Sequence, residues 1–236
     1  MTVLSDHTIE LSDLTFHYRE AGNPGAPPLI LLHQLLADAQ DWDEIALTLA
    51  EHYHIFALDQ RGHGGSARPG IYSFELMRDD LKAFADALLL DRFTLIGHSM
   101  GGTVAFLFAE SWPERIERLV IEDTPPPHGK SALSDIPEEP PETVPPHWQS
   151  NWQLVKSIVR QLRNPDPSWW RDLPTITAPT LIIGGGSTSD IPQEQLAEVA
   201  HLIPDCRLVT IEGAGHTVHQ NRPEEYKALL RNFLFG

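Results

Sequence analysis

The sequence predicts an α/β fold in which a mostly parallel sheet of eight strands is flanked by helices. Short apolar runs alternate along the chain with longer amphipathic stretches, which is the pattern expected when helices connect parallel strands. One of the apolar runs leads directly into a glycine-flanked serine at residues 97–101 and then into a helical pattern. The 236 residues are enough for one large domain with its own apolar core.

The strand candidates are short and apolar, and their order along the chain suggests how they pair. The first two, at residues 7–11 and 14–18, are close together and predict an antiparallel pair. The remaining six are each separated by a longer stretch, which favours parallel pairing. They lie at residues 29–32, 53–58, 93–96, 119–121, 180–183 and 207–211.

The helix candidates lie between these strands and have apolar residues at helical spacing. They cover residues 42–51, 74–89, 100–111, 193–203 and 224–233. Ser73 precedes the second of them and is expected to be its N-cap. Pro223 stands where the first turn of the last helix accepts a proline.

An insertion at residues 124–174 interrupts the alternation of strands and helices. We therefore expect a core formed by residues 1–123 and 175–236, with the insertion as a short cap. The first half of the insertion contains eight prolines and cannot hold a long helix, because each proline removes a backbone donor. Only residues 148–163 have helical spacing, so the sequence predicts a reduced cap with about one helix over a fairly open pocket.

Composition excludes several kinds of partner. The 33 Asp and Glu exceed the 17 Lys and Arg, and the net charge of −16 repels phosphate backbones and anionic lipid, so we expect neither nucleic acid nor membrane partners. No apolar run approaches the ~20 residues of a membrane span. Residues 1–10 lack the apolar segment of a signal peptide, and Cys206 has no second cysteine to pair with. We expect a cytoplasmic protein; the sequence leaves its oligomeric state open.

Ser99 is the candidate nucleophile. It is the central residue of a G-x-S-x-G sequence that follows an apolar strand and precedes a helix. Such a sharp turn strains the backbone of the central residue, and the flanking glycines remove side chains that would collide there. The hydroxyl should therefore project above the sheet. The backbone N–H of Met100, at the start of the helix, is expected to donate to an oxyanion.

Four motifs in this order resemble the α/β-hydrolase family over nearly the whole chain. They are His33 after the third strand, the segment at residues 59–66 after the fourth, residues 97–102, and residues 213–216 near the end. Together they are specific for the fold and much less specific for the substrate. The resemblance implies a nucleophile, histidine and acid triad that needs no metal. The glycines at 184–186 have neither P-loop nor dinucleotide-binding spacing, so we expect no cofactor.

His216 is the candidate base, because the family carries its catalytic histidine on the loop after the last strand. Imidazole suits this role since its pKa lies near neutrality. His219 follows three residues later, but no third ligand has a matching spacing, so we expect no metal site there. His33, His63 and His98 belong to the family motifs, where they are expected to support loops.

The acid is where this chain departs from most of the family. Most members carry an Asp soon after the strand that here covers residues 180–183, but alignment on Pro192 places Thr188 at that position. Asp190 is displaced by two residues and is expected to cap a helix.

One branch of the family, which includes some bacterial and mitochondrial esterases, places the acid after the preceding strand in a segment resembling V-D-I-x-P. Residues 120–125 of this chain read Val-Ile-Glu-Asp-Thr-Pro. We predict Asp123 as the acid, with Asp190 as the alternative and Glu122 as a third candidate, because strand alternation turns Glu122 and Asp123 to opposite sides.

A second oxyanion donor is expected from the loop after His33, where the family reads H-G-x and the N–H of x faces the carbonyl oxygen. The matching donor here is the backbone N–H of Leu35. Gln34 replaces the glycine, and glutamine tolerates positive φ poorly, so this turn is a point of difference. The Gln34 side-chain amide is a further candidate donor.

These residues predict a serine hydrolase of the carboxylesterase kind that acts on a small-molecule ester or other acyl substrate. Four cap tryptophans, Trp148, Trp152, Trp169 and Trp170, either line the acyl pocket or pack against the base of the cap. Two alternatives remain open. Residues 33–42 also resemble the menaquinone-pathway synthase that eliminates pyruvate with the same triad, although that enzyme uses a cluster of arginines. A ligand receptor on a hydrolase scaffold is the other.

Overall fold

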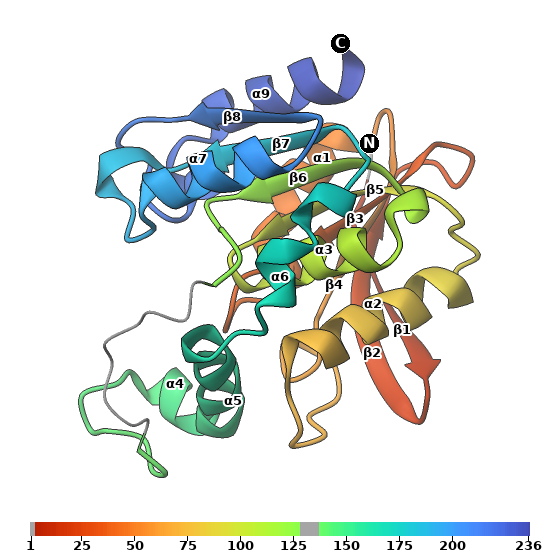
Figure 1. Ribbon diagram of the computed structural model, residues 1–236. Helices are drawn as coiled ribbons and strands as arrows, with labels where there is room; N and C mark the ends of the chain where they lie inside the picture. Colours follow the sequence, from red (N-terminus) through yellow and green to blue (C-terminus); the bar gives the residue numbers. More distant parts are fainter. Residues whose placement is uncertain (1–2, 128–136) are drawn as a thin grey trace.

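A single sheet of eight strands forms the centre of the computed structural model, which describes residues 3–127 and 137–236 (Figure 1). The strand order is β1-β2-β4-β3-β5-β6-β7-β8. β1 pairs antiparallel with β2 and β2 antiparallel with β4, whereas all other neighbours are parallel. The predicted mostly parallel sheet is confirmed. The strands are β1 Ser5–Leu11, β2 Leu14–Ala21, β3 Pro28–Leu32, β4 His54–Leu58, β5 Phe93–His98, β6 Ile116–Glu122, β7 Thr180–Gly184 and β8 Cys206–Thr210.

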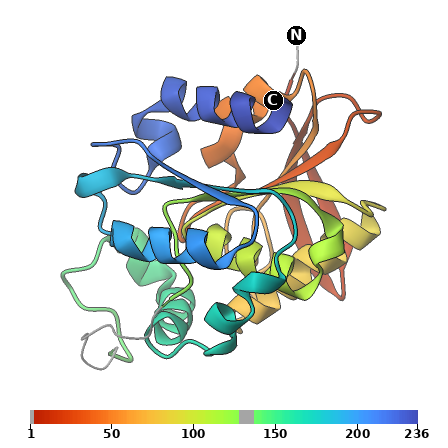
Figure 2. The same ribbon diagram turned by 45° about the horizontal axis from the view of Figure 1, so that its top comes forward.

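Helices cover both faces of this sheet, and Figure 2 shows the layers. Helix α1, from the first quarter of the chain, and α9, at its C-terminal end, cover one face. Helices α2, α3 and α7 cover the other. The helices are α1 Asp43–Leu49, α2 Phe74–Ala87, α3 Met100–Ser111, α4 Pro146–Ser150, α5 Trp152–Arg163, α6 Ser168–Arg171, α7 Gln193–Leu202, α8 Val218–Asn221 and α9 Pro223–Phe235. No helix in the described part of the chain is long and apolar enough to cross a membrane.

Strand β3 shows why the sheet needs helices on both sides. Leu29 and Leu31 join the core cluster beneath α1 and α9, while Ile30 and Leu32 join the cluster beneath α2 and α3. Successive side chains of a strand point to opposite faces, so an uninterrupted apolar run is stable only when both faces are covered. All four side chains are fully buried.

The predicted helix ends are confirmed at two positions. The Ser73 hydroxyl accepts a hydrogen bond from the backbone N–H of Leu76 at 3.1 Å and so caps α2. Pro223 is the first residue of α9. The third expectation is wrong: the N-cap of α7 is Pro192, and Asp190 lies exposed in the preceding loop.

The cap holds more helix than the sequence predicts. In place of one helix over residues 148–163, α4 and α5 are separated at Asn151, whose amide donates to the carbonyl of His147 at 2.8 Å and ends the first of them. A third short helix, α6, begins after Asp166 accepts a hydrogen bond from the backbone N–H of Ser168 at 2.8 Å. Helices of four or five residues leave too short a pattern to detect by periodicity. The division into core and cap stays a prediction.

Candidate active site

The turn between β5 and α3 holds Ser99 in a backbone conformation with φ 52° and ψ −118°, which non-glycine residues rarely adopt. The glycines around it are required by close packing. A Cβ on Gly97 would lie 2.4 Å from the carbonyl oxygen of Gly101, and a Cβ on Gly101 would lie 2.4 Å from that of Leu32. The backbone can therefore turn this sharply only without side chains at these positions, as the motif predicts.

His216 lies beside this serine. The imidazole Nε2 is 2.9 Å from the Ser99 hydroxyl oxygen, and the Nδ1 is 3.0 Å from Oδ2 of Asp123. Gly215 fixes the approach of the loop, since its backbone N–H donates to the carbonyl of Gly185 at 2.9 Å. A carboxylate only accepts, so Nδ1 carries the proton and Nε2 is free to accept from the hydroxyl. The three side chains form one continuous hydrogen-bonded chain.

The Asp123 carboxylate is fully buried and accepts four hydrogen bonds. Oδ1 accepts from the backbone N–H of Gly185 at 2.8 Å and from the Gln193 amide at 3.2 Å. Oδ2 accepts from the Ser189 hydroxyl as well as from His216. A buried carboxylate that accepts this many hydrogen bonds is held in one orientation. Asp123 itself has φ 45°, so a second strained turn aims the carboxylate.

The alternative acid lies elsewhere. Asp190 is exposed in the loop before α7, whereas the hydrogen-bond partner of His216 Nδ1 is Asp123. Sequence reasoning did not identify Ser189 and Gln193, which surround the Asp123 carboxylate. The sequence did contain a signal for them. Both follow the apolar strand at residues 180–183, and segments that follow parallel strands border the site in this kind of sheet.

The loop after β3 carries the remaining predicted residues. Leu35 borders the same pocket as Ser99 and Met100. The positive φ that the family's glycine implies is not taken by Gln34; instead Leu36 has φ 64°. His33 holds the turn, since its Nδ1 donates to the carbonyl of Gln34 at 2.7 Å and its Nε2 accepts from the backbone N–H of Gln60 at 3.1 Å. Burial lowers the pKa of His33, which keeps the imidazole neutral in this role.

A pocket of about 220 Å³ opens beside Ser99. Its walls are mainly apolar, and the described residues that form it include no charged side chain. Phe74 begins α2, Pro125 belongs to the start of the insertion, and Ile158 and Leu162 come from α5. This volume lies below the roughly 300–1,000 Å³ of pockets that hold drug-sized ligands. The site therefore suits a small, neutral, apolar group.

Three of the four cap tryptophans make packing or hydrogen-bond contacts and are not among the residues that border this pocket. Trp169 is buried and contacts Phe74 edge to face, with ring centroids 5.5 Å apart. The indole N–H of Trp170 donates to the carbonyl of Pro126 at 3.1 Å, and that of Trp152 donates to the carbonyl of Pro137 at 3.1 Å. Of the two interpretations of these residues, packing against the cap holds for these three.

A larger hollow of about 600 Å³ lies at the opposite edge of the sheet. It is bordered by Pro28 and His54, which begin β3 and β4, together with Leu89 after α2. Ligands of open α/β sheets bind at the carboxyl ends of the strands, so we assign the chemistry to the smaller pocket at Ser99.

A family model described as the alpha/beta hydrolase fold matches residues 27–145, which is half of the chain. The chain belongs to the α/β-hydrolase family. The region matched includes both glycine-rich turns at β4 and β5, and the eight-stranded sheet agrees with this assignment. The predicted family and fold are confirmed.

Two curated relatives of this α/β hydrolase carry names that describe ester cleavage. The sn-1-specific diacylglycerol lipase ABHD11 of Mus musculus is 27% identical over 254 residues, covering 90% of this chain and 82% of its own. The Esterase YbfF of Escherichia coli (strain K12) is 26% identical over 243 residues, covering 88% of this chain and 92% of its own.

Solved structures resemble the chain along almost its whole length. A membrane phospholipase A, described as a bacterial virulence factor, is 28% identical with a TM-score of 0.78, covering 98% of this chain and 86% of its own. A hydrolase from Pseudomonas aeruginosa PA01 is 25% identical with a TM-score of 0.77, covering 98% and 99%. These similarities extend across the cap as well as the core.

Proposed function

We propose that this α/β hydrolase is a serine hydrolase that cleaves carboxylic esters through an acyl-enzyme intermediate. The observation that carries the proposal is the hydrogen-bonded chain from the Ser99 hydroxyl through His216 to the Asp123 carboxylate, with distances of 2.9 and 3.0 Å. The names of the relatives, an esterase and a diacylglycerol lipase, support an ester as the substrate.

In the proposed mechanism, Nε2 of His216 takes the hydroxyl proton of Ser99 while the oxygen attacks the ester carbonyl. The imidazolium that forms is stabilised by the Asp123 carboxylate, whose orientation is fixed by its other three donors. The leaving alcohol takes the proton from Nε2. Water then attacks the acyl-enzyme with His216 again as base, and the free acid leaves.

The oxyanion is proposed to bind to the backbone N–H groups of Met100 and Leu35. Met100 is the first residue of α3, so its N–H has no partner within the helix and the positive end of the helix dipole adds to its effect. Leu35 borders the pocket from the facing loop. Gln34 is retained as a third candidate donor through its side-chain amide. Loss of one such donor costs about 10²–10³-fold in turnover.

The experiment that tests this function uses p-nitrophenyl esters and a fluorophosphonate probe. We expect release of p-nitrophenol from the butyrate ester, with a burst equal to the enzyme concentration if deacylation is the slower step. We also expect mass spectrometry to locate the phosphonyl adduct on Ser99. No turnover of esters from acetate to octanoate, together with no adduct, would reject the hydrolase and favour the ligand receptor.

The synthase that eliminates pyruvate is not favoured by the site. Its resemblance to residues 33–42 comes with a requirement for a cluster of arginines, and the described residues around the pocket at Ser99 include no arginine or lysine. Release of p-nitrophenol from a simple ester separates this alternative from the proposed function as well. The cytoplasmic location stays a prediction from the sequence.

Pocket size leads to a prediction about acyl chain length. Leu162 is 36% exposed at the cap side of the pocket, and its replacement by tryptophan shortens the available space. Each buried methylene contributes about 0.8 kcal/mol, so excluding two of them lowers kcat/KM for the octanoate ester about tenfold. The acetate ester does not reach this far, and its kcat/KM is expected to change less than about twofold.

The matched control is Leu47→Trp, a similarly exposed leucine on α1 at the other face of the sheet. It should leave the ratio of octanoate to acetate kcat/KM unchanged. An unaltered ratio in Leu162→Trp would show that the acyl group does not occupy this pocket.

A further inference from the structure

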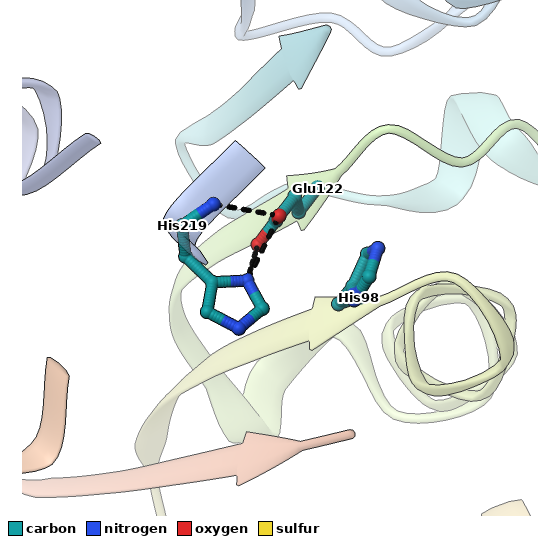
Figure 3. Close-up of side chains that lie close together, drawn as sticks. All are labelled: His98, Glu122 and His219. Carbon is teal, nitrogen blue, oxygen red and sulfur yellow. Dashed lines mark hydrogen bonds and ion pairs between the residues drawn. The ribbon is translucent and has the colours of Figure 1, made fainter. Parts of the chain in front are cut away.

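Three buried polar side chains lie together directly behind the candidate triad (Figure 3). His98 ends β5, Glu122 ends β6, and His219 lies on α8. Figure 3 shows the ring and the backbone nitrogen of His219 both facing the Glu122 carboxylate, with His98 beside them. Their exposed fractions are 0%, 0% and 3%. The proposed mechanism uses none of the three, and burial of so many polar groups calls for a physical reason.

Glu122 and His219 form a charged pair. One Glu122 oxygen accepts from the backbone N–H of His219 at 3.0 Å, and His219 Nδ1 lies 2.9 Å from both carboxylate oxygens. Burial alone raises the pKa of Glu122, but the adjacent histidine rings and these hydrogen bonds bring it down to about 2. Burial alone lowers the pKa of His219, but the charges of Glu122 and Asp41 raise it to about 10. At neutral pH one group is an anion and the other a cation.

His98 is neutral and has a fixed tautomer. Burial lowers the pKa of His98 to about 4. Its Nε2 lies 2.8 Å from the carbonyl oxygen of His216, and a carbonyl only accepts, so Nε2 carries the proton and donates it. Nδ1 of His98 is buried without a hydrogen-bond partner among the described residues. The one strong hydrogen bond of this side chain is therefore made to the backbone of the candidate base.

The cluster joins every segment that carries a candidate catalytic group. His98 precedes Ser99, Glu122 precedes Asp123, and His219 follows His216 by three residues. On its far side His219 Nε2 lies 3.6 Å from Asp41 in the loop after β3.

The ring of Trp42 in that loop stacks on His219 with centroids 4.4 Å apart. This is the loop that also supplies Leu35. The four segments of the site are thus tied together by hydrogen bonds and charges beneath it.

A buried ion pair adds little to the free energy of unfolding. The desolvation cost of a buried ion pair offsets most of its attraction, and apolar residues of similar volume often give equal or greater stability. Unlike an apolar contact, a hydrogen-bonded ion pair is directional. The Glu122 carboxylate faces both Nδ1 and the backbone N–H of His219, and so it fixes where α8 begins. Misplacing a catalytic group by about 1 Å costs about 10²-fold in rate.

We propose that His98, Glu122 and His219 are positioning residues that hold the His216 imidazole at hydrogen-bonding distance from Ser99. His98 acts on the backbone carbonyl of His216, and the Glu122 and His219 pair anchors the loop three residues later. This inference rests on the proposed function, since it assigns a role within the same site. A metal bound through Nδ1 of His219 would displace the proton that Glu122 accepts, so a metal at that nitrogen and the observed pair exclude each other.

The test compares two amides at residue 98. The Nε2 of glutamine is as many bonds from Cβ as the Nε2 of histidine, whereas asparagine is one carbon too short to reach the carbonyl of His216. We expect His98→Asn to lower kcat for p-nitrophenyl butyrate about 10- to 100-fold with KM changed less than about twofold. His98→Gln should retain kcat within about threefold of wild type, with both variants melting at similar temperatures.

A second variant removes Glu122 and His219 together, so that neither is left facing the empty place of the other, and Asp41 keeps the Gln220 amide as a hydrogen-bond donor. Glu122→Leu combined with His219→Leu is expected to stay folded, as judged by its melting temperature, and to lose kcat about 10- to 100-fold with KM unchanged. Equal kcat in His98→Asn, His98→Gln and wild type, or a fully active double variant, would overturn the proposal. So would loss of wild-type activity in EDTA that zinc restores. Failure of the hydrolase function itself is distinguishable, because then wild type has no Ser99-dependent turnover to compare.

Discussion

Replacement of Ser99 by alanine is expected to lower the turnover of p-nitrophenyl butyrate about 10⁴-fold or more. The substitution removes the hydroxyl oxygen that lies 2.9 Å from Nε2 of His216 and that the proposed mechanism uses as nucleophile. Residual turnover above the uncatalysed rate comes from the oxyanion donors and from substrate binding, which the alanine leaves in place. Comparison of kcat for the purified variant and wild type measures the effect.

The control for this variant is Ser111→Ala on the same helix. The Ser111 hydroxyl donates to the carbonyl of Leu107 at 2.7 Å at the far end of α3, so its loss should leave kcat unchanged. Melting temperatures close to that of wild type show that both variants are folded. If Ser99→Ala retains more than about a tenth of the turnover, another group must be the nucleophile and the proposed mechanism is wrong.

Replacement of Asp123 by asparagine is expected to reduce kcat about 10³- to 10⁴-fold. An asparagine can still accept from Gly185 and Gln193 through its oxygen. Its NH₂ group then meets two donors, the Ser189 hydroxyl and Nδ1 of His216. The imidazole relieves this conflict by moving its proton to Nε2, where it can no longer accept from Ser99. The variant is therefore expected to stay folded, with an imidazole that can no longer take the proton of Ser99.

Asp190→Asn is the matched control, because it makes the same chemical change in an exposed loop that has no hydrogen bond to His216. Its kcat should stay within about twofold of wild type. The two variants are compared with the same p-nitrophenyl ester at pH 7 to 8. If Asp190→Asn is inactive and Asp123→Asn is active, the acid of the triad is Asp190, in the loop before α7, and not Asp123.

The eight strands and the five long helices could be predicted from the sequence, because the apolar run or the helical spacing of apolar residues in each extends over enough residues to be recognised. The continuous apolar run in β3 and the glycines around Ser99 depend only on local chemistry. Asp123, the side chain that meets His216 Nδ1, was predicted from the resemblance to one branch of the family, and strand alternation separated it from Glu122, which bonds to His219 instead.

Features that depend on neighbours distant in the sequence could not be predicted. The hydrogen bond from Ser189 to Asp123 joins residues 66 positions apart, and that from His98 to His216 joins residues 118 apart. The positive φ at Leu36 in place of Gln34 belongs to a turn in which His33 is bonded to Gln60 from the loop after β4. The short helices of the cap arise at single polar residues such as Asn151, which give no repeating signal.

Two strand ends meet at the Asp123 carboxylate oxygen that faces Nδ1 of His216, which bears on where a triad acid can come from. Asp123 reaches the imidazole from the end of β6, and Ser189 from the loop after β7 touches the same carboxylate oxygen. An ancestral protein with a carboxylate at either strand end could therefore have gained a second one at the other without moving the base. Because both strand ends already meet at one carboxylate oxygen beside His216, an exchange of the proposed acid between them would leave the candidate base in place.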